Sequence, residues 1–453
     1  MEASKARGSS RATRRRQDMT AKKVAVVGGG LGGLAAAALL ARGGCSVTLF
    51  ERSKHLGGRG QTSEVDGFKF NLGPRALAVA GAGMRVLGRL GVKPQGSVPG
   101  QKGGTYALRA GRLHTLPRGP VSLLTSDLLG LAGKLELARF LGGMPRVDAD
   151  ALEDVSMKAW LDTRVSSHEV REVAGALVRV ASYCADLEVL SAQAAVRQLQ
   201  QALKANVLYV DEGWGSLVAS VTSVAREAGV RVELSAKVER VVVRDGRVVG
   251  LRMGDGTVHA VDAVVVAGAP GDVAAMLPGD EVLERQAAAA TPVKAATLEL
   301  GLSRLPKPQA LFALGIDGPW YASVHSAYAK LGPEGGAMVH VMKYLTEADG
   351  PTGEAELESV MDALQPGWRE VLVAKRFRPS LVVTHLLPTA KEGGLSGRPT
   401  PQVPHVGGLF RVGDWVGDEG MLVDASFASA EAVAHALLRQ ERHAEPLRMA
   451  AGA

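Results

Sequence analysis

The sequence is poor in cysteine and in aromatic residues. Its 453 residues include only two cysteines, Cys45 and Cys184, and 4% Phe, Trp and Tyr. Two thiols cannot build a disulfide framework, and no Cys-x-x-Cys or His-rich cluster indicates a metal site. The scarcity of rings disfavours an extensive aromatic cage around an amine, although two rings would suffice. With 46% hydrophobic and 22% charged residues, the composition is that of an ordinary soluble chain long enough for two or three domains.

Excess charge of one sign is confined to the N-terminus. Residues 1–23 contain eight lysines and arginines against Glu2 and Asp18, so they carry +6 of the total net charge of +7 and leave only +1 for the remainder. This distribution argues against a global basic surface for nucleic acid and predicts a disordered basic tail over residues 1–22. No apolar segment of a secretion signal follows Arg14–Arg16 before the first expected strand. We therefore expect a cytoplasmic protein whose tail contacts anionic lipid or has no function.

One uncharged run, Val24–Ala41, is long enough to span a membrane. Five of its eighteen residues are glycine, and helix formation across Gly28–Gly30 would be costly. We therefore interpret the run as a short strand followed by a glycine-rich turn and a helix.

The same run carries the spacing of a dinucleotide-binding motif. Val24–Val27 is an apolar stretch typical of a buried parallel strand. Gly28, Gly30 and Gly33 follow at G-x-G-x-x-G spacing: the first permits a tight turn, the second lets the backbone approach pyrophosphate, and the third lets helix pack on strand. The expected helix, Leu31–Arg42, would direct the amides of its first residues, including Gly32, at the phosphates.

A second expected strand, Ser46–Phe50, ends at Glu51, followed by Arg52. Glu51 stands 23 residues after Gly28, where an acid would accept hydrogen bonds from ribose hydroxyls. Strand, helix, second strand and acid in this register predict dinucleotide binding, although this segment alone does not distinguish FAD from NAD.

A second segment, near the C-terminus, has the form of a strand, an acidic turn and a helix. Leu409–Val412 reads as a strand, Gly413 and Asp414 as the turn, and apolar residues then recur at helical spacing from Met421 to about Leu438. Such a segment can hold the flavin end of FAD. Asp414 could also simply cap a turn.

Two further motifs lie between these segments. Leu56–Arg59 reads LGGR, in which glycines permit close backbone approach and Arg59 can pair with phosphate. Phe68–Pro74 reads FKFNLGP, a short strand before a Gly-Pro break. With these residues the chain resembles the FAD-dependent superfamily of amine oxidases, protoporphyrinogen oxidases and phytoene desaturases, and it looks most like the desaturase branch.

The resemblance implies FAD as the cofactor and assigns roles to single residues. In similar flavoproteins a strand backbone pairs with adenine, which points to Val238. The acid after the last strand binds a ribitol hydroxyl, which points to Asp414, and the next helix directs amides at the flavin, here those of Met421 and Leu422. Gly58 and Arg59 belong to the shared G-G-R element. By the same resemblance to amine oxidases, Lys294 is the one candidate catalytic residue, as a lysine bridged by water to flavin N5, although an ordinary exposed lysine fits its position too.

The expected architecture is α/β, with a Rossmann-type FAD-binding domain built from both chain ends and a middle segment. An α+β substrate domain adds a mixed sheet and a helical insertion. We expect the FAD-binding parts at 23–76, 207–290 and 401–442, the helical region at 77–206, the substrate-domain sheet at 291–400, and a tail at 443–453.

The expected activity is hydride transfer from a substrate carbon to flavin N5, with an apolar small molecule such as an isoprenoid or carotenoid as substrate. One departure counts against a carotenoid: Asp418, Glu419 and Asp424 crowd a segment that is rich in Pro and Gly in phytoene desaturases. The alternatives are an amine or protoporphyrinogen-type oxidase and, in another class, a non-catalytic protein of the Rab GDP-dissociation-inhibitor type. Apolar stretches at Val121–Leu131 and Leu135–Met144 are interpreted as helical core, a lipid-like tunnel or a peripheral membrane surface.

Overall fold

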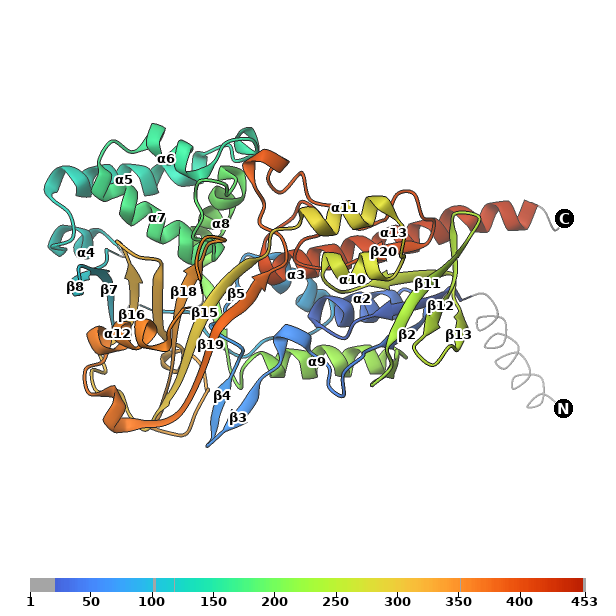
Figure 1. Cartoon of the computed structure of the whole chain (residues 1–453), viewed down its shortest axis with the longest axis horizontal. Helices are drawn as coiled ribbons and strands as arrows, with labels where there is room; N and C mark the ends of the chain where they lie inside the picture. The colour runs from blue at the N-terminus through green and yellow to red at the C-terminus, as the bar shows by residue number, and fades with distance from the viewer. Residues whose placement is uncertain (1–20, 101–102, 118, 351, 451–453) are drawn as a thin grey trace, which may run out of the picture.

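The computed structural model describes residues 21–100, 103–117, 119–350 and 352–450. It contains two α/β halves that lie side by side (Figure 1). The expected basic tail falls almost wholly outside the described residues. The expected C-terminal tail continues the last helix, which ends at Ala450.

The first half, the parallel-sheet domain, is built on five parallel strands drawn from distant parts of the chain. Their order is β10 (Arg231–Glu233), β2 (Ser46–Phe50), β1 (Lys23–Val27), β14 (Ala263–Val266) and β20 (Leu409–Arg411). All four residues of β14 are buried, as expected of a strand covered on both faces. The predicted Rossmann-type sheet, formed by both chain ends and a middle segment, is confirmed.

Helices cover one face of this sheet and a small antiparallel sheet covers the other. Helix α2 (Leu31–Arg42) packs between α9 (Trp214–Glu227) and α13 (Leu422–Ala450), which also packs on α3 (Ala82–Arg89). The alanines Ala35–Ala38 of α2 have no exposed surface, because small side chains let the helices approach closely. The opposite face packs against β11 (Val238–Arg244), β12 (Arg247–Met253) and β13 (Val258–Ala260), with α10 (Pro270–Ala275) and α11 (Glu281–Ala289).

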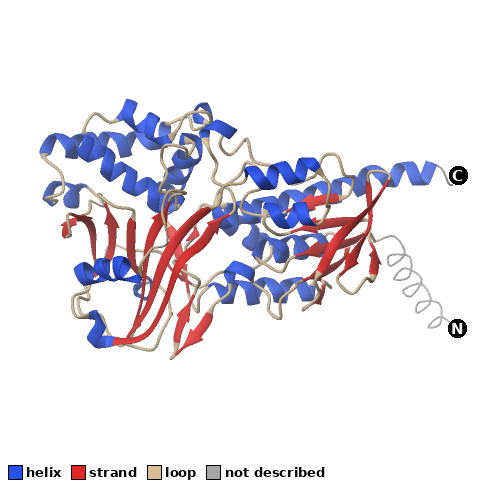
Figure 2. Cartoon of the chain, viewed as in Figure 1, coloured by secondary structure: helices blue, strands red, loops and turns tan. Residues whose placement is uncertain are grey.

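The second half, the mixed-sheet domain, is built on a sheet of seven strands, with helices on both sides of it (Figure 2). All neighbours are antiparallel except β7 and β16, which are parallel. The order is β19 (Leu372–Thr384), β15 (Val293–Leu302), β18 (Ala337–Leu345), β17 (Trp320–Val324), β16 (Ala310–Gly315), β7 (Gly104–Arg109) and β8 (Arg112–Thr115). Helix α12 (Glu354–Leu364) covers one face, and the helical region covers the other.

The segment expected to be largely helical is only partly so. Its helices are α4 (Pro120–Thr125), α5 (Leu131–Gly143), α6 (Met157–Arg164), α7 (His168–Ser182) and α8 (Ala192–Ala205). Strands β7 and β8 of the large sheet also belong to it, and β5 (Leu77–Ala78) and β6 (Gly96–Ser97) pair with β9 (Val207–Val210). The β7–β8 turn contains Ala110 and Gly111, both with positive φ, the geometry of a tight two-residue hairpin. A second hairpin joins β3 (Ser63–Val65) to β4 (Phe68–Phe70).

The helical region leaves an apolar surface exposed. Val121 and Leu124 of α4 are 76% and 71% exposed, and Leu131 and Leu135 of α5 are 71% and 51% exposed. Leu137 is the single fully buried side chain of α5. Among the described helices, none is both long and apolar enough to cross a bilayer.

Candidate functional site: a cavity between the two sheets

A cavity of about 660 Å³ lies where the two halves meet. Val27, Phe50 and Val266, the last residues of three parallel strands, contribute to its wall, and so do Thr297 and Met342 of the large sheet. Ligands of parallel α/β sheets bind beyond the carboxyl ends of the strands, and the volume falls in the range of small-molecule sites. The cavity therefore lies where the fold predicts a ligand.

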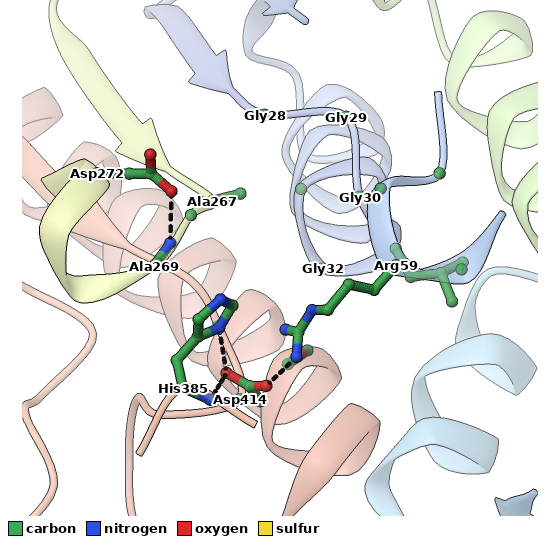
Figure 3. A pocket seen from close by; sticks show the side chains of 18 of the residues that line it. Gly28, Gly29, Gly30, Gly32, Arg59, Ala267, Ala269, Asp272, His385 and Asp414 are labelled. Atoms are coloured by element: carbon green, nitrogen blue, oxygen red, sulfur yellow. Dashed lines mark hydrogen bonds and ion pairs between the residues drawn. The ribbon is translucent and has the colours of Figure 1, made fainter. Parts of the chain in front are cut away.

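The glycine loop forms the cavity wall and shows why each glycine is there. Gly28 has a φ of +109°, and a Cβ on it would lie 2.3 Å from the carbonyl oxygen of Ala267. A Cβ on Gly33 would lie 2.1 Å from the carbonyl oxygen of Gly28. Gly30 differs, because its backbone is extended and a Cβ there would meet no protein atom within 4 Å. The fold does not require glycine at position 30, whereas a ligand lying against the loop would (Figure 3).

The N-terminus of α2 presents unbonded amides to the same space. The helix has no side-chain cap, and its first backbone bond runs from Leu34 N to Gly30 O at 2.9 Å. The amides of Leu31, Gly32 and Gly33 therefore precede the bonded turn, and all three residues line the cavity. Such a helix end favours a phosphate. A Cβ on Gly32 would lie 2.9 Å from Val412, so this glycine also lets α2 pack against the C-terminal segment.

Glu51 lies at the cavity wall with its carboxylate held in place. Its Oε2 accepts a hydrogen bond from Gly29 N at 2.7 Å, and its Oε1 accepts one from Ser53 N at 2.8 Å. Each oxygen retains a second lone pair for a ribose hydroxyl. Arg52 is at the rim, where its 73% exposed side chain lies 3.6 Å from Asp272; an exposed pair of this kind contributes little.

The LGGR motif packs against the glycine loop. Gly57 N donates to Gly29 O at 2.8 Å, and a Cβ on Gly58 would lie 3.6 Å from Gly30 Cα. Gly58 and Arg59 both line the cavity, as does Val238 at the start of β11. The predicted nucleotide-binding residues thus surround one space.

Asp414 is the centre of a charged cluster in the cavity wall (Figure 3). The side chain is 2% exposed, and its Oδ2 lies 2.7 Å from Arg59 Nη1. His385 Nδ1 lies 3.0 Å from Asp414 Oδ1. Burial alone would raise the pKa of Asp414, but the Arg59 charge and the His385 hydrogen bond hold it well below its ordinary value. Asp414 therefore stays ionised, with an oxygen available to accept from a ligand hydroxyl.

Sequence reasoning missed two partners of this cluster, His385 and Arg398. His385 follows β19, so only the tertiary fold brings it to Asp414. Arg398 is 5% exposed and donates to the carbonyl oxygens of Asp414 at 3.2 Å and Gly420 at 2.7 Å. Both hydrogen bonds fix the loop before α13. Arg398 stands 15 residues before Gly413, so no local pattern links it to the Gly-Asp turn.

The structure brings one of the two predicted residues at the start of α13 to the cavity. Leu422, the first residue of the helix, lines the wall and has a φ of +56°. The side chain of Met421 is instead buried in the core of the helical region, and its carbonyl oxygen accepts from Asp424 N at 3.1 Å. Of the two residues, Leu422 lines the wall and Met421 does not, and the contact of the Met421 amide with the flavin stays a prediction.

The acidic residues near α13 face away from the cavity. Asp424 accepts from Gly83 N and from Gln201, each at 2.7 Å, and burial raises its pKa. Glu419 pairs with Arg85 at 2.6 Å. These acids join α13 to α3 and α8, so they do not create a binding surface for a cationic substrate.

Lys294 lies outside the cavity. Its side chain is exposed, and successive residues of a strand face opposite sides. Thr297 lines the cavity, and Lys294, three residues earlier on β15, is on the other face of the sheet. The predicted catalytic role of Lys294 is therefore not supported by its position.

The remaining wall, which we call the substrate arm, combines apolar residues with a few polar ones. Its apolar members are Leu72, Pro74, Ala76, Trp214, Met342 and Leu381, and its polar members are Arg75, Tyr183 and Thr297. Of these residues, only those at the Gly-Pro break before Arg75 belong to a motif recognised from the sequence. Parallel strands, a glycine loop at their carboxyl ends and a second sheet that closes the space define a two-domain dinucleotide-binding protein.

Comparisons with known proteins place the chain in a family. The family model for flavin-containing amine oxidoreductases matches residues 31–438. A 4,4'-diaponeurosporene oxygenase of Staphylococcus aureus is 26% identical over 280 residues, which cover 54% of this chain and 55% of that protein. A carotenoid 3,4-desaturase of Haloarcula japonica is 42% identical over 78 residues, 17% of this chain and 16% of that protein. An oxidoreductase from Methanosarcina mazei has a similar structure, with a TM-score of 0.73 at 17% identity, over 91% of this chain and 99% of that one.

The chain belongs to the family of flavin-containing amine oxidoreductases. FAD is the cofactor that this family implies, and the open space at Gly30, the free helix end and the ionised Asp414 fit it. The predicted superfamily, cofactor and class of FAD-dependent oxidoreductase are thereby confirmed. The chain spans about half the length of the curated relatives that it matches first.

Proposed function

We propose that this protein is an FAD-dependent dehydrogenase or desaturase acting on a largely apolar substrate. The observation that carries the proposal is the composition of the substrate arm, in which six apolar residues share the wall with one charged side chain, Arg75. An apolar wall binds hydrocarbon and excludes water from the reacting atoms. The two relatives named for carotenoid substrates support the same substrate class.

Each part of the cavity has a distinct task in this proposal. The glycine loop and the α2 amides hold the pyrophosphate, Glu51 holds the adenosine ribose, and Asp414 accepts from a ribityl hydroxyl. When bound, FAD supplies the acceptor for a hydride from a substrate carbon. Thr297 and Met342 of the large sheet close the reacting space from one side.

The amine oxidase alternative is disfavoured by charge. An amine substrate carries a positive charge at neutral pH, and Arg75 is a partly buried cation in the same arm. Two like charges in a water-poor cavity repel each other strongly. The non-catalytic alternative leaves the glycine at position 30 unexplained, since the fold itself does not require it.

The test is anaerobic mixing of the purified holoprotein with an acyclic polyene, a porphyrinogen and a primary amine in separate experiments. We expect the visible flavin absorbance to bleach with the polyene and to persist with the amine. Bleaching by the amine alone would overturn the proposal. An absence of bound flavin in protein reconstituted with FAD would overturn the enzymatic interpretation altogether.

We further propose that the enzyme meets its substrate at a membrane surface. Leu131, Leu135 and Arg139 recur at four-residue spacing on the exposed side of α5, and Lys134 links this helix to α4 through a hydrogen bond to Leu124 O. Exposed aliphatic side chains flanked by cations suit anionic lipid. We expect sedimentation with phosphatidylglycerol vesicles, lost in a Leu124→Ser, Leu131→Ser double variant and retained in Val258→Ser, which removes a 60% exposed valine from β13. Binding that is unchanged in the double variant would contradict this surface.

A further inference from the structure

Arg75 is a partly buried cation that lines the cavity without a close carboxylate. Its Nε and Nη2 donate only to the carbonyl oxygens of Asn71 and Leu72, both at the long distance of 3.4 Å. Its guanidinium carbon lies 5.5 Å from the ring centroid of Trp214. Among the described residues, no ion pair within 4.0 Å involves Arg75. The planar guanidinium has five N–H donors, so most of its hydrogen-bonding capacity remains available.

The nearest acids are already engaged by other residues. Glu299 is fully buried, and it accepts from Arg378 Nη1 at 2.7 Å and from Asn71 N at 3.0 Å. Asp414 is paired with Arg59 at 2.7 Å. Each of these acids is therefore paired with another arginine, and neither pairs with Arg75.

Arg75 nevertheless keeps its charge. Burial, together with the Arg59 charge, lowers the pKa of Arg75 to about 10, while Tyr183, Glu299 and Asp414 act in the opposite direction. A group with this pKa is protonated at neutral pH. Arg75 is partly withdrawn from water, and such a charge without a counter-charge is costly. Its presence in a ligand cavity therefore indicates that a ligand supplies the missing anion.

We propose that Arg75 is the anion-binding residue of the substrate arm and that the substrate is an apolar molecule carrying a carboxylate. The planar guanidinium matches a carboxylate through two parallel hydrogen bonds. Tyr183 and Thr297 add neutral hydroxyl groups to the same wall. The rest of the arm is apolar, so one small, singly charged anion fits better than a phosphate, which would bring a second negative charge. This inference rests on the proposed function and narrows its substrate class.

The test uses ligands of the same shape and different charge. Benzoate and benzyl alcohol form a small pair, and retinoate and retinol form a long one. Binding to the oxidised holoenzyme is measured from the change in visible flavin absorbance. We expect the carboxylate of each pair to bind about 30-fold more tightly than the alcohol, as one charge-assisted contact implies.

Three variants test whether Arg75 causes the tighter binding of the carboxylates. Arg75→Met should reduce the ratio of carboxylate affinity to alcohol affinity to about one while leaving the alcohol affinity unchanged. Arg75→Lys should keep part of the preference for the carboxylate. Arg179→Met is the matched control, because Arg179 is also a partly buried arginine, and it donates to the carbonyl oxygens of Gly315 and Ile316 outside this cavity. This control should retain the wild-type ratio.

Several outcomes would overturn the inference. Equal binding of acid and alcohol by the wild type, or no binding of any of the four ligands, would do so. A Kd for FAD that rises in Arg75→Met while the ratio is unchanged would assign the anion to the cofactor instead. A wild-type preference for carboxylates together with no turnover of any apolar substrate would refute the proposed function and leave the anion site intact.

Discussion

The nucleotide end of the cavity is formed mainly by backbone, whereas the substrate arm is formed by side chains. At the nucleotide end, Gly28, Gly30 and Gly58 bring the main chain to the cavity surface. The amides at the start of α2 are the hydrogen-bond donors available to a ligand there. In the substrate arm, Arg75 and Met342 project from elements of different halves. Backbone contacts require particular glycines, while side-chain contacts can change without altering the fold. The nucleotide end therefore determines which cofactor binds, and the substrate arm determines which substrate binds.

The largest expected effect is at Gly30. A Gly30→Val substitution places a side chain in space that no protein atom occupies, so the apoprotein should fold normally and lose FAD affinity by about 100-fold through displaced phosphate hydrogen bonds. Equilibrium dialysis with FAD and thermal unfolding of the apoprotein measure both quantities. Gly88→Val is the control, because Gly88 of α3 also has open space around it but lies away from the cavity. Wild-type affinity in Gly30→Val would contradict the role of this glycine.

Asp414→Asn is expected to have the next largest effect. The variant leaves the Arg59 charge without its buried partner, so we expect a loss of about 2 kcal/mol in the free energy of unfolding and about 10-fold weaker FAD binding. Urea unfolding and FAD titration are the measurements. Asp418→Asn changes an exposed acid of the same loop and should alter neither value. If Asp414→Asn and Asp418→Asn have the same free energy of unfolding and the same FAD affinity, the Asp414 cluster does not contribute to FAD binding.

Acid should weaken the mixed-sheet domain through buried histidines behind the substrate arm. Burial lowers the pKa of His340 to about 4, and the nearby Glu299 acts in the opposite direction. The unfolded state, with an ordinary histidine pKa near 6.5, binds more protons between pH 6.5 and 4, so stability falls as the pH is lowered through this window. His340 should contribute about 2 kcal/mol of this loss by pH 5. Urea unfolding at a series of pH values should show a smaller slope in His340→Gln, and no change in slope in His55→Gln, which alters an exposed histidine.

The smallest effect is expected at Lys294. Lys294→Met changes an exposed residue on the face of β15 opposite to the cavity. Rapid mixing should therefore give wild-type rates for flavin reduction by substrate and for flavin reoxidation by oxygen. A tenfold slower reoxidation would show that the lysine acts on the flavin despite its position.

The nucleotide end could be predicted because its signals are local. The spacing from Gly28 to Glu51 encodes strand, turn, helix and strand within one short segment, and the structure gives α2 and β2 the predicted bounds. The same holds for the strand before Gly413, expected at Leu409–Val412 and present as β20 at Leu409–Arg411. Where consecutive residues determine both the conformation and the chemistry, the sequence pattern is sufficient to predict the site.

The substrate arm could not be predicted, because distant segments form it. Trp214 and Met342 of this arm stand 142 and 270 residues after Leu72 in the chain. Outside the arm, His385 likewise reaches Asp414 only through the course of β19. Lys294 and Thr297 lie on the same strand, β15, but the alternation of its residues does not say which face meets the cavity. Met421 and Leu422 are adjacent, and the positive φ of Leu422, which separates them, has no sequence signature.

The central claim is that one FAD molecule contacts both chain ends, with its nucleotide at the glycine loop and its flavin at Asp414. Calorimetric titration of the apoprotein with FAD and, separately, with ADP tests it most directly. We expect one FAD per chain, weaker binding of both ligands to Gly30→Val, and weaker binding of FAD alone to Asp414→Asn. An Asp414→Asn variant that binds ADP as poorly as it binds FAD, or that binds FAD like the wild type, would contradict the claim.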